Sequence, residues 1–103
     1  MHFRITADTV ELVEPADVRA FSLVSPPELT AAGLAASVAR AELGVVLPDG
    51  EHVMVAVDAV RRLADGRVGP TWPDELAKMI DYAAGKGWTD EDRTHVRAHI
   101  ERR

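Results

Sequence analysis

Apolar and polar residues alternate at the start of the chain in a way that is typical of β-strands. Phe3 and Ile5 are separated by a polar residue, and Val10 and Leu12 resume the alternation after a short polar interruption. A period of two residues places apolar side chains on one face of a strand. The pattern predicts that residues 1–24 are rich in strand and begin with a hairpin.

The segment over residues 16–24 allows two interpretations. Val18 and its neighbours alternate in polarity, as a third strand would. Val18 and Phe21 are also three residues apart after Pro15, which fits a short helix. We favour the strand, and the sequence leaves the helix open.

A helix is expected over residues 26–43. Ser25 precedes a proline and is followed three residues later by Glu28, which is a capping-box pattern. Gly44 suits the end of this helix. The helix is rich in alanine, so we expect it to pack closely on the sheet through small side chains.

The middle of the chain predicts a second hairpin over residues 45–57. Asp49 and Gly50 form a strong turn signal between two apolar runs. The second run is apolar on both faces, as in a strand that is covered on both sides. A short helix over residues 59–64 should follow, capped by Asp58.

The last third of the chain predicts a helical hairpin over residues 73–102. Pro73 is favoured at the first position of the first helix, where its missing N–H costs nothing. Thr89 is a natural N-cap for the second helix. The four-residue spacing of Val96 and Ile100 then gives that helix a narrow apolar stripe.

These elements together predict an α+β fold: a small antiparallel sheet, one Ala-rich helix packed on it and a C-terminal helical hairpin. At 103 residues, the chain is too short for two separate cores. We therefore expect residues 1–103 to form a single domain.

Composition narrows the location and the partners of the protein. A formal net charge of −5 disfavours nucleic acid and anionic membrane surfaces as partners. No cysteine is present, so disulfides and thiolate metal sites are excluded. No apolar run reaches membrane-spanning length, and the first residues lack the order of a signal peptide. We expect an acidic cytoplasmic protein without nucleic-acid or membrane partners.

Candidate catalytic and metal-binding residues are few. His95 and His99 are four residues apart, as zinc ligands on a helix are, but the metalloprotease glutamate is absent and Arg97 lies between them. We therefore expect no metal. No glycine-rich phosphate loop and no nucleophile motif is present, so we expect no cofactor and assign no catalytic residue.

Aromatic residues and one histidine are the candidate ligand-binding residues. Trp72 and Trp88 lie at the two ends of the first predicted C-terminal helix, and both are interpreted first as core anchors. The alternative is that they line a pocket between the sheet and the helical hairpin, together with Tyr82 and His52. Arg61, Arg62 and Arg67 form a separate basic cluster that is a candidate anion-binding site.

Two classes of function remain. We favour a small non-catalytic module that binds a protein partner or itself, with a homodimer as one form, because the sequence has more apolar surface than a thin sheet easily hides. The alternative is a small enzyme or small-molecule-binding domain that uses the pocket described above. A deep pocket with converging polar groups would favour the second class, and a large flat apolar patch the first.

Overall fold

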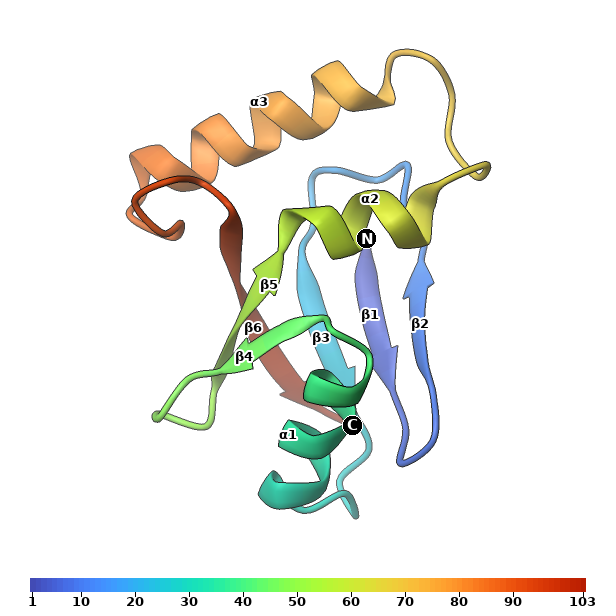
Figure 1. The fold of residues 1–103 in the computed structure, drawn as a ribbon, viewed down its shortest axis with the longest axis vertical. Coiled ribbons are helices and arrows are strands. Elements are labelled where there is room, and N and C mark those ends of the chain that lie inside the picture. Colours follow the sequence, from blue (N-terminus) through green and yellow to red (C-terminus); the bar gives the residue numbers. More distant parts are fainter.

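Six strands and three helices make up the structure, a computed structural model that describes residues 1–103 (Figure 1). The strands are β1 (His2–Ile5), β2 (Val10–Val13), β3 (Ser22–Ser25), β4 (Gly44–Val46), β5 (His52–Ala56) and β6 (His95–Arg102). The helices are α1 (Ala31–Arg40), α2 (Val57–Ala64) and α3 (Trp72–Gly85).

All six strands belong to one mixed sheet that curls into a half-barrel (Figure 1), with the order β2-β1-β3-β6-β5-β4. The pairs β1–β2, β4–β5 and β5–β6 are antiparallel, whereas β3 runs parallel to both β1 and β6. The expected small antiparallel sheet is therefore wrong. The reason is topological: β3 does not pair with β2, which precedes it, but passes to the far side of β1 and enters from the same end as β1.

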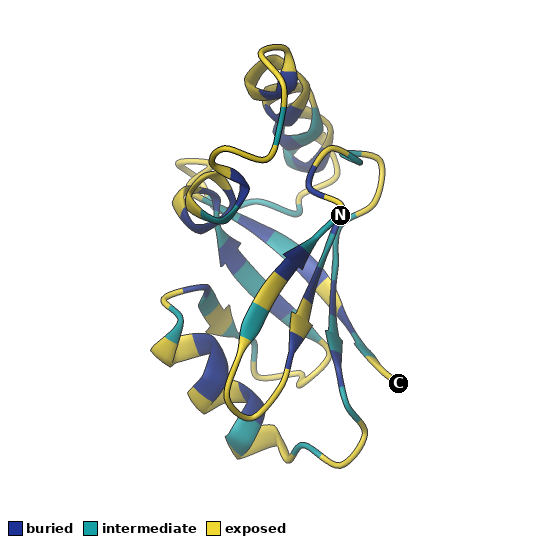
Figure 2. Ribbon diagram, turned by 90° about the vertical axis from the view of Figure 1, so that its right-hand side faces the viewer, coloured by how far each residue is buried: buried dark blue, intermediate teal, exposed yellow.

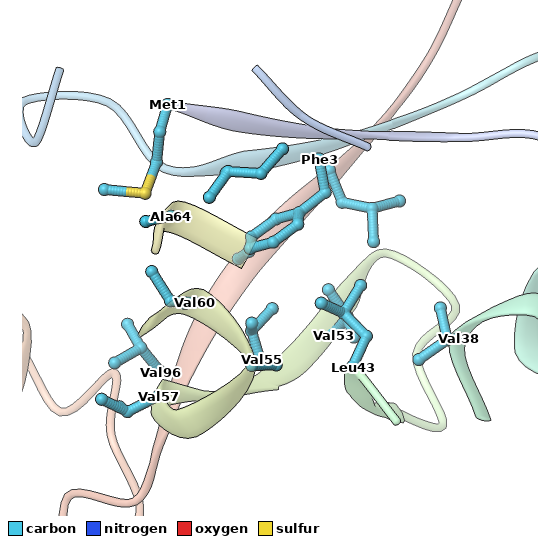
Figure 3. Packing of buried hydrophobic residues seen from close by; sticks show 14 of the residues in the cluster. Met1, Phe3, Val38, Leu43, Val53, Val55, Val57, Val60, Ala64 and Val96 are labelled. Atoms are coloured by element: carbon cyan, nitrogen blue, oxygen red, sulfur yellow. The ribbon is translucent and has the colours of Figure 1, made fainter. Parts of the chain in front are cut away.

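The core lies on the concave face of the sheet. Phe3 is paired with Leu12 on one side and with Leu23 on the other, and Leu23 is paired with Ile100, so buried side chains align across four strands. Figure 2 shows α1 and α2 on the same side of the sheet and α3 beyond one of its ends. Figure 3 shows Phe3 among side chains of β5 and α2, including Val60. Burial of this apolar surface is the main term that holds the layers together.

The C-terminal helical hairpin is wrong in its second half, because residues His95–Arg102 form the strand β6. A four-residue spacing of Val96 and Ile100 occurs on one face of a helix and also on one face of a strand. Ala98, midway between them, is buried as well, and the intervening residues are polar. The true period is therefore two residues.

A turn, and not a helix cap, precedes β6. Thr89 forms an isolated bridge with Val96 instead of starting a helix. Asp90 Oδ1 accepts hydrogen bonds from the backbone N–H groups of Thr94 (2.7 Å) and His95 (3.0 Å). Arg93 has a φ of 58°, in the left-handed region, which reverses the chain. Side-chain acceptors that serve helix caps serve such turns equally well.

The Ala-rich helix starts five residues later than expected. Thr30 is its N-cap, with Oγ1 accepting from the N–H of Gly33 at 3.0 Å. Ser25 belongs to β3, is fully buried, and pairs with Arg102 in β6. The prolines after Ser25 form a turn that separates the strand from the helix. The segment 16–24 is a strand only from Ser22 onward, and the residues before it are turns and irregular loop.

The second predicted hairpin is present as β4 and β5, joined by the turn that includes Asp49. Gly44, expected to end a helix, instead opens β4. A Cβ at Gly44 would lie 1.9 Å from the carbonyl oxygen of Met54, so only glycine permits this close strand pairing. The short helix α2 follows β5 directly, and Asp58 lies in its first turn and does not cap it.

Candidate functional site

A split in the sheet along β6 creates a pocket. Near its start, β6 bonds to the segment after α3: the N–H of Arg97 donates to the carbonyl of Trp88 at 2.7 Å. From His99 onward, the same edge of β6 pairs with β3, beginning at Ser22. The edge therefore changes partner at Ala98, and the two neighbouring segments leave a gap between them.

The gap is a pocket of about 290 Å³, which we call the β6 pocket. Three parts of the chain enclose it: the loop before β3, the outer face of β5 and β6, and the second half of α3 with the turn that follows. Its lining residues are Val18, Arg19, Ala20, Phe21, His52, Met79, Tyr82, Ala83, Trp88, Val96, Arg97 and His99. A volume of this size is at the lower end of the range for small-molecule sites.

Aromatic side chains form one wall of the β6 pocket. Tyr82 and Trp88 pack edge to face, with ring centroids 6.1 Å apart. Phe21 makes a similar contact with the core residue Phe3, at 5.8 Å. Tyr82 is 62% exposed and Trp88 is half-buried. Aromatic faces that remain partly open offer apolar contact area to a ligand without further loss of side-chain freedom.

Two imidazoles lie side by side on the opposite wall. His52 and His99 face each other across β5 and β6, with ring centroids 5.5 Å apart. The N–H of Ile100 donates to the carbonyl of Glu51, so the histidines form a pair without backbone hydrogen bonds between them. Side chains of such pairs approach more closely than those of hydrogen-bonded pairs.

Asp49 fixes the orientation of one of these imidazoles. Nδ1 of His52 lies 2.7 Å from Asp49 Oδ2, and a carboxylate only accepts, so Nδ1 is the nitrogen that carries the proton. The backbone N–H of Glu51, followed by the side chain of His52, donates to Asp49 and lowers the pKa of its carboxyl. Nε2 of His52 has no partner within the chain and is therefore available to a ligand.

Arginines border the β6 pocket at two places. Arg19 donates through Nε to Asp17 at 3.3 Å, and its side chain is 90% exposed. The backbone N–H of Arg19 bonds to the same carboxyl, and these bonds lower the pKa of Asp17. Arg97 is half-buried and its side chain makes no hydrogen bond or ion pair. Since no buried side-chain nitrogen lacks a partner, the guanidinium of Arg97 remains accessible.

The structure brings three of the four predicted ligand-binding residues together. His52, Tyr82 and Trp88 line the β6 pocket, although the helix expected beside them is a strand. Trp72 lies elsewhere: it is 5% exposed, and its indole N–H donates to the carbonyl of Pro15 at 2.7 Å. Trp72 is therefore a core residue. This agrees, for Trp72, with the interpretation of the tryptophans as core anchors.

The sequence interpretation missed Arg97 and His99 as pocket residues. Alternation over 95–102 was the signal that places both on the polar face of one strand. Phe21 was missed for a different reason, because no local pattern shows that the loop before β3 folds against the segment after α3.

The predicted basic cluster does not converge on one point. Arg61 lies 3.6 Å from Asp58, in an exposed ion pair. Arg62 donates to the carbonyl of Ala41 at 2.9 Å, and Arg67 donates to that of Leu63 at 3.3 Å. Each guanidinium thus has its own partner within the chain.

No serine, cysteine or carboxylate is among the lining residues of the β6 pocket. The side chains there that could take part in chemistry are the hydroxyl of Tyr82 and the imidazoles of His52 and His99. No group of three His, Cys, Asp or Glu side chains is placed to hold a metal ion. His95, which the sequence pairs with His99 at zinc-ligand spacing, instead lies with its Nδ1 3.1 Å from Asp90 Oδ2.

Comparison of the chain with protein-family models, with curated proteins and with solved structures finds no match. None of the three helices has the length and apolar character that crossing a membrane requires. The geometry of the pocket is therefore the basis for any functional assignment.

Proposed function

We propose that this domain binds a small molecule in the β6 pocket, without catalysis. This proposal is supported by the change in the hydrogen-bonding partner of the β6 edge at Ala98. The change opens a pocket in the sheet and not merely a shallow depression of the surface. Polar groups converge on it from one side and aromatic groups from the other, which is the usual composition of a ligand site. We place this function in the cytoplasm, in line with the absence of cysteine.

Binding of a protein partner, or of a second copy, has less support. The large hydrophobic residues that are exposed are Val45, on β4, and Tyr82, on α3. These two residues come from different elements and form no broad apolar patch, whereas interfaces between proteins usually require one. The small-molecule function, given above as the alternative, is the better-supported proposal.

A substitution at the rim of the pocket tests this function. Ala20 is exposed and lines the pocket, so Ala20→Phe should fill it without touching the core. Ala32, exposed on α1, provides the matched control Ala32→Phe. The probe is 2-naphthamide, an uncharged aromatic molecule, added to ¹⁵N-labelled protein during two-dimensional NMR.

Saturable shifts of the Trp88 indole and the Ala83 amide are expected in the wild type and in Ala32→Phe. Ala20→Phe should weaken binding at least tenfold. Absence of saturable shifts in the wild type, or equal binding by the two variants, would contradict the proposed function.

A further inference from the structure

The β6 pocket is lined by basic groups in a protein that is acidic overall. Four of its twelve lining residues are Arg or His, and none is Asp or Glu. The whole chain has 17 acidic residues and 12 Lys and Arg residues. A cleft lined by groups of one sign focuses its field and attracts ligands of the opposite sign. Arg19 is already paired with Asp17, and His52 with Asp49, so the unpaired positive charge in the pocket is that of Arg97. This charge favours an anion.

Arg97 is the group best placed to bind that anion. The carboxylate of Asp17 already occupies Arg19, whereas the side chain of Arg97 has no partner within the chain and is half-buried. A guanidinium presents two parallel N–H groups that match the two oxygens of a carboxylate. Partial burial reduces the screening that weakens such a pair in water.

His99 provides a second polar contact on the same wall. It follows Arg97 by two residues on β6, so the two side chains point to the same face, roughly 7 Å apart along the strand. The His99 side chain also has no hydrogen bond within the chain, and the His52 ring packs against it. A carboxylate at Arg97 thus lies within reach of an imidazole donor.

The rest of the ligand must suit an apolar wall. Trp88 and Phe21 present aromatic surface, and Met79 adds a flexible apolar side chain. We propose that the ligand is a small aromatic carboxylate, with its anionic group on Arg97 and His99 and its ring against Trp88. This assignment of ligand class rests on the proposed binding function.

Two probes of the same shape separate the contribution of the charge to binding from the contribution of the aromatic ring. 2-Naphthoate and 2-naphthamide differ in charge, and both are titrated by NMR into wild type, Arg97→Met, Arg97→Lys and Arg61→Met. Arg97→Met keeps the apolar stem and removes the charge. Arg61→Met is the control, because Arg61 is exposed on α2 and pairs with Asp58.

The wild type and Arg61→Met should bind the carboxylate at least tenfold more tightly than the amide. Arg97→Met should reduce this ratio to near one and leave the affinity for the amide unchanged. Arg97→Lys, which keeps the charge without the two-pronged geometry, should give an intermediate ratio, and it decides the matter if Arg97→Met does not fold.

Equal binding of the two probes by the wild type would overturn the carboxylate assignment and leave the binding function in place. The same reduction in Arg61→Met as in Arg97→Met would also overturn the assignment. Failure of both probes to bind would instead overturn the binding function itself.

Discussion

The two tryptophans lie at opposite ends of α3 and have different surroundings. Trp72 begins the helix, is 5% exposed, and donates its indole N–H to the carbonyl of Pro15. Trp88 follows the helix, is half-buried, and its indole N–H has no partner within the chain. Trp72 is the first residue of α3 and Trp88 lies three residues after its last, and the difference in burial comes from what each end of α3 packs against.

The Trp72 end packs on the core, whereas the Trp88 end packs where the sheet divides. At the first end, Trp72 and Leu76 belong to the cluster of buried residues. Ile80 and Ala83 of the second half of α3 also belong to it, but Trp88 is only partly buried against it. At the second end, the chain after α3 bonds to the first part of β6 and leaves the β6 pocket beside β3. Side chains that line an open pocket make fewer packing contacts than side chains in the core. Substitutions at the two ends of α3 should therefore change the stability of the protein by different amounts.

Truncation at the Trp72 end should have the largest effect. Trp72→Ala removes a buried ring and is expected to lower the free energy of unfolding by about 3–5 kcal/mol, as other large core truncations do. Chemical denaturation measures this loss. Trp72→Phe, which keeps most of the ring but leaves the Pro15 carbonyl unpaired, should cost about 1–3 kcal/mol. A loss below about 1 kcal/mol in Trp72→Ala would show that this end is not core.

Truncation at the Trp88 end should cost less stability and more binding. Trp88 is only partly buried, so Trp88→Ala should lower the free energy of unfolding by less than Trp72→Ala does, roughly 1–2 kcal/mol. Affinity for 2-naphthoate should fall at least tenfold, because the naphthalene ring of the probe loses its contact with the indole ring of Trp88. A stability loss equal to that of Trp72→Ala, with binding intact, would remove the distinction between the two ends.

The sequence predicts the structure around the Trp72 end of α3 better than the structure around the Trp88 end, and the reason is physical. Pro73 and the apolar spacing after it are local signals, and α3 begins and ends close to where they predict. The first and second hairpins were also predictable from local alternation and turn residues. The pairing of β3 with β1 and β6 depends on contacts between distant segments, which local patterns do not contain.

The strand β6 was misread because two periods share the same four-residue spacing. Val96 and Ile100 fit both, and the charged residues before them resemble a helix start. The buried Ala98 distinguishes the periods, but alanine is a weak signal in either structure. The pocket residues Tyr82, Trp88 and His52 were therefore predicted beside the wrong element. Arg97 could be placed only once β6 was known to be a strand.

Acid should loosen the Trp88 end selectively, and this is the smallest effect that we predict. The hydroxyl of Thr94, followed by the backbone N–H of His95, donates to Asp90 and lowers the pKa of its carboxyl from 3.8 to about 2. A lowered pKa in the folded state means that this stabilisation is complete above pH 3.8. It is lost as the pH falls from 3.8 through 2.

The turn that Asp90 holds follows Trp88 directly, so the Trp88 indole resonance should shift over this pH range more than the Trp72 resonance does. The two indole N–H signals in two-dimensional NMR measure this. Asp90→Asn provides the control, because its amide does not titrate and other carboxyls with lowered pKa values, such as that of Asp17, remain. The difference between wild type and Asp90→Asn isolates the contribution of Asp90. An identical acid response in the two proteins would show that the Trp88 end is held by contacts other than this turn.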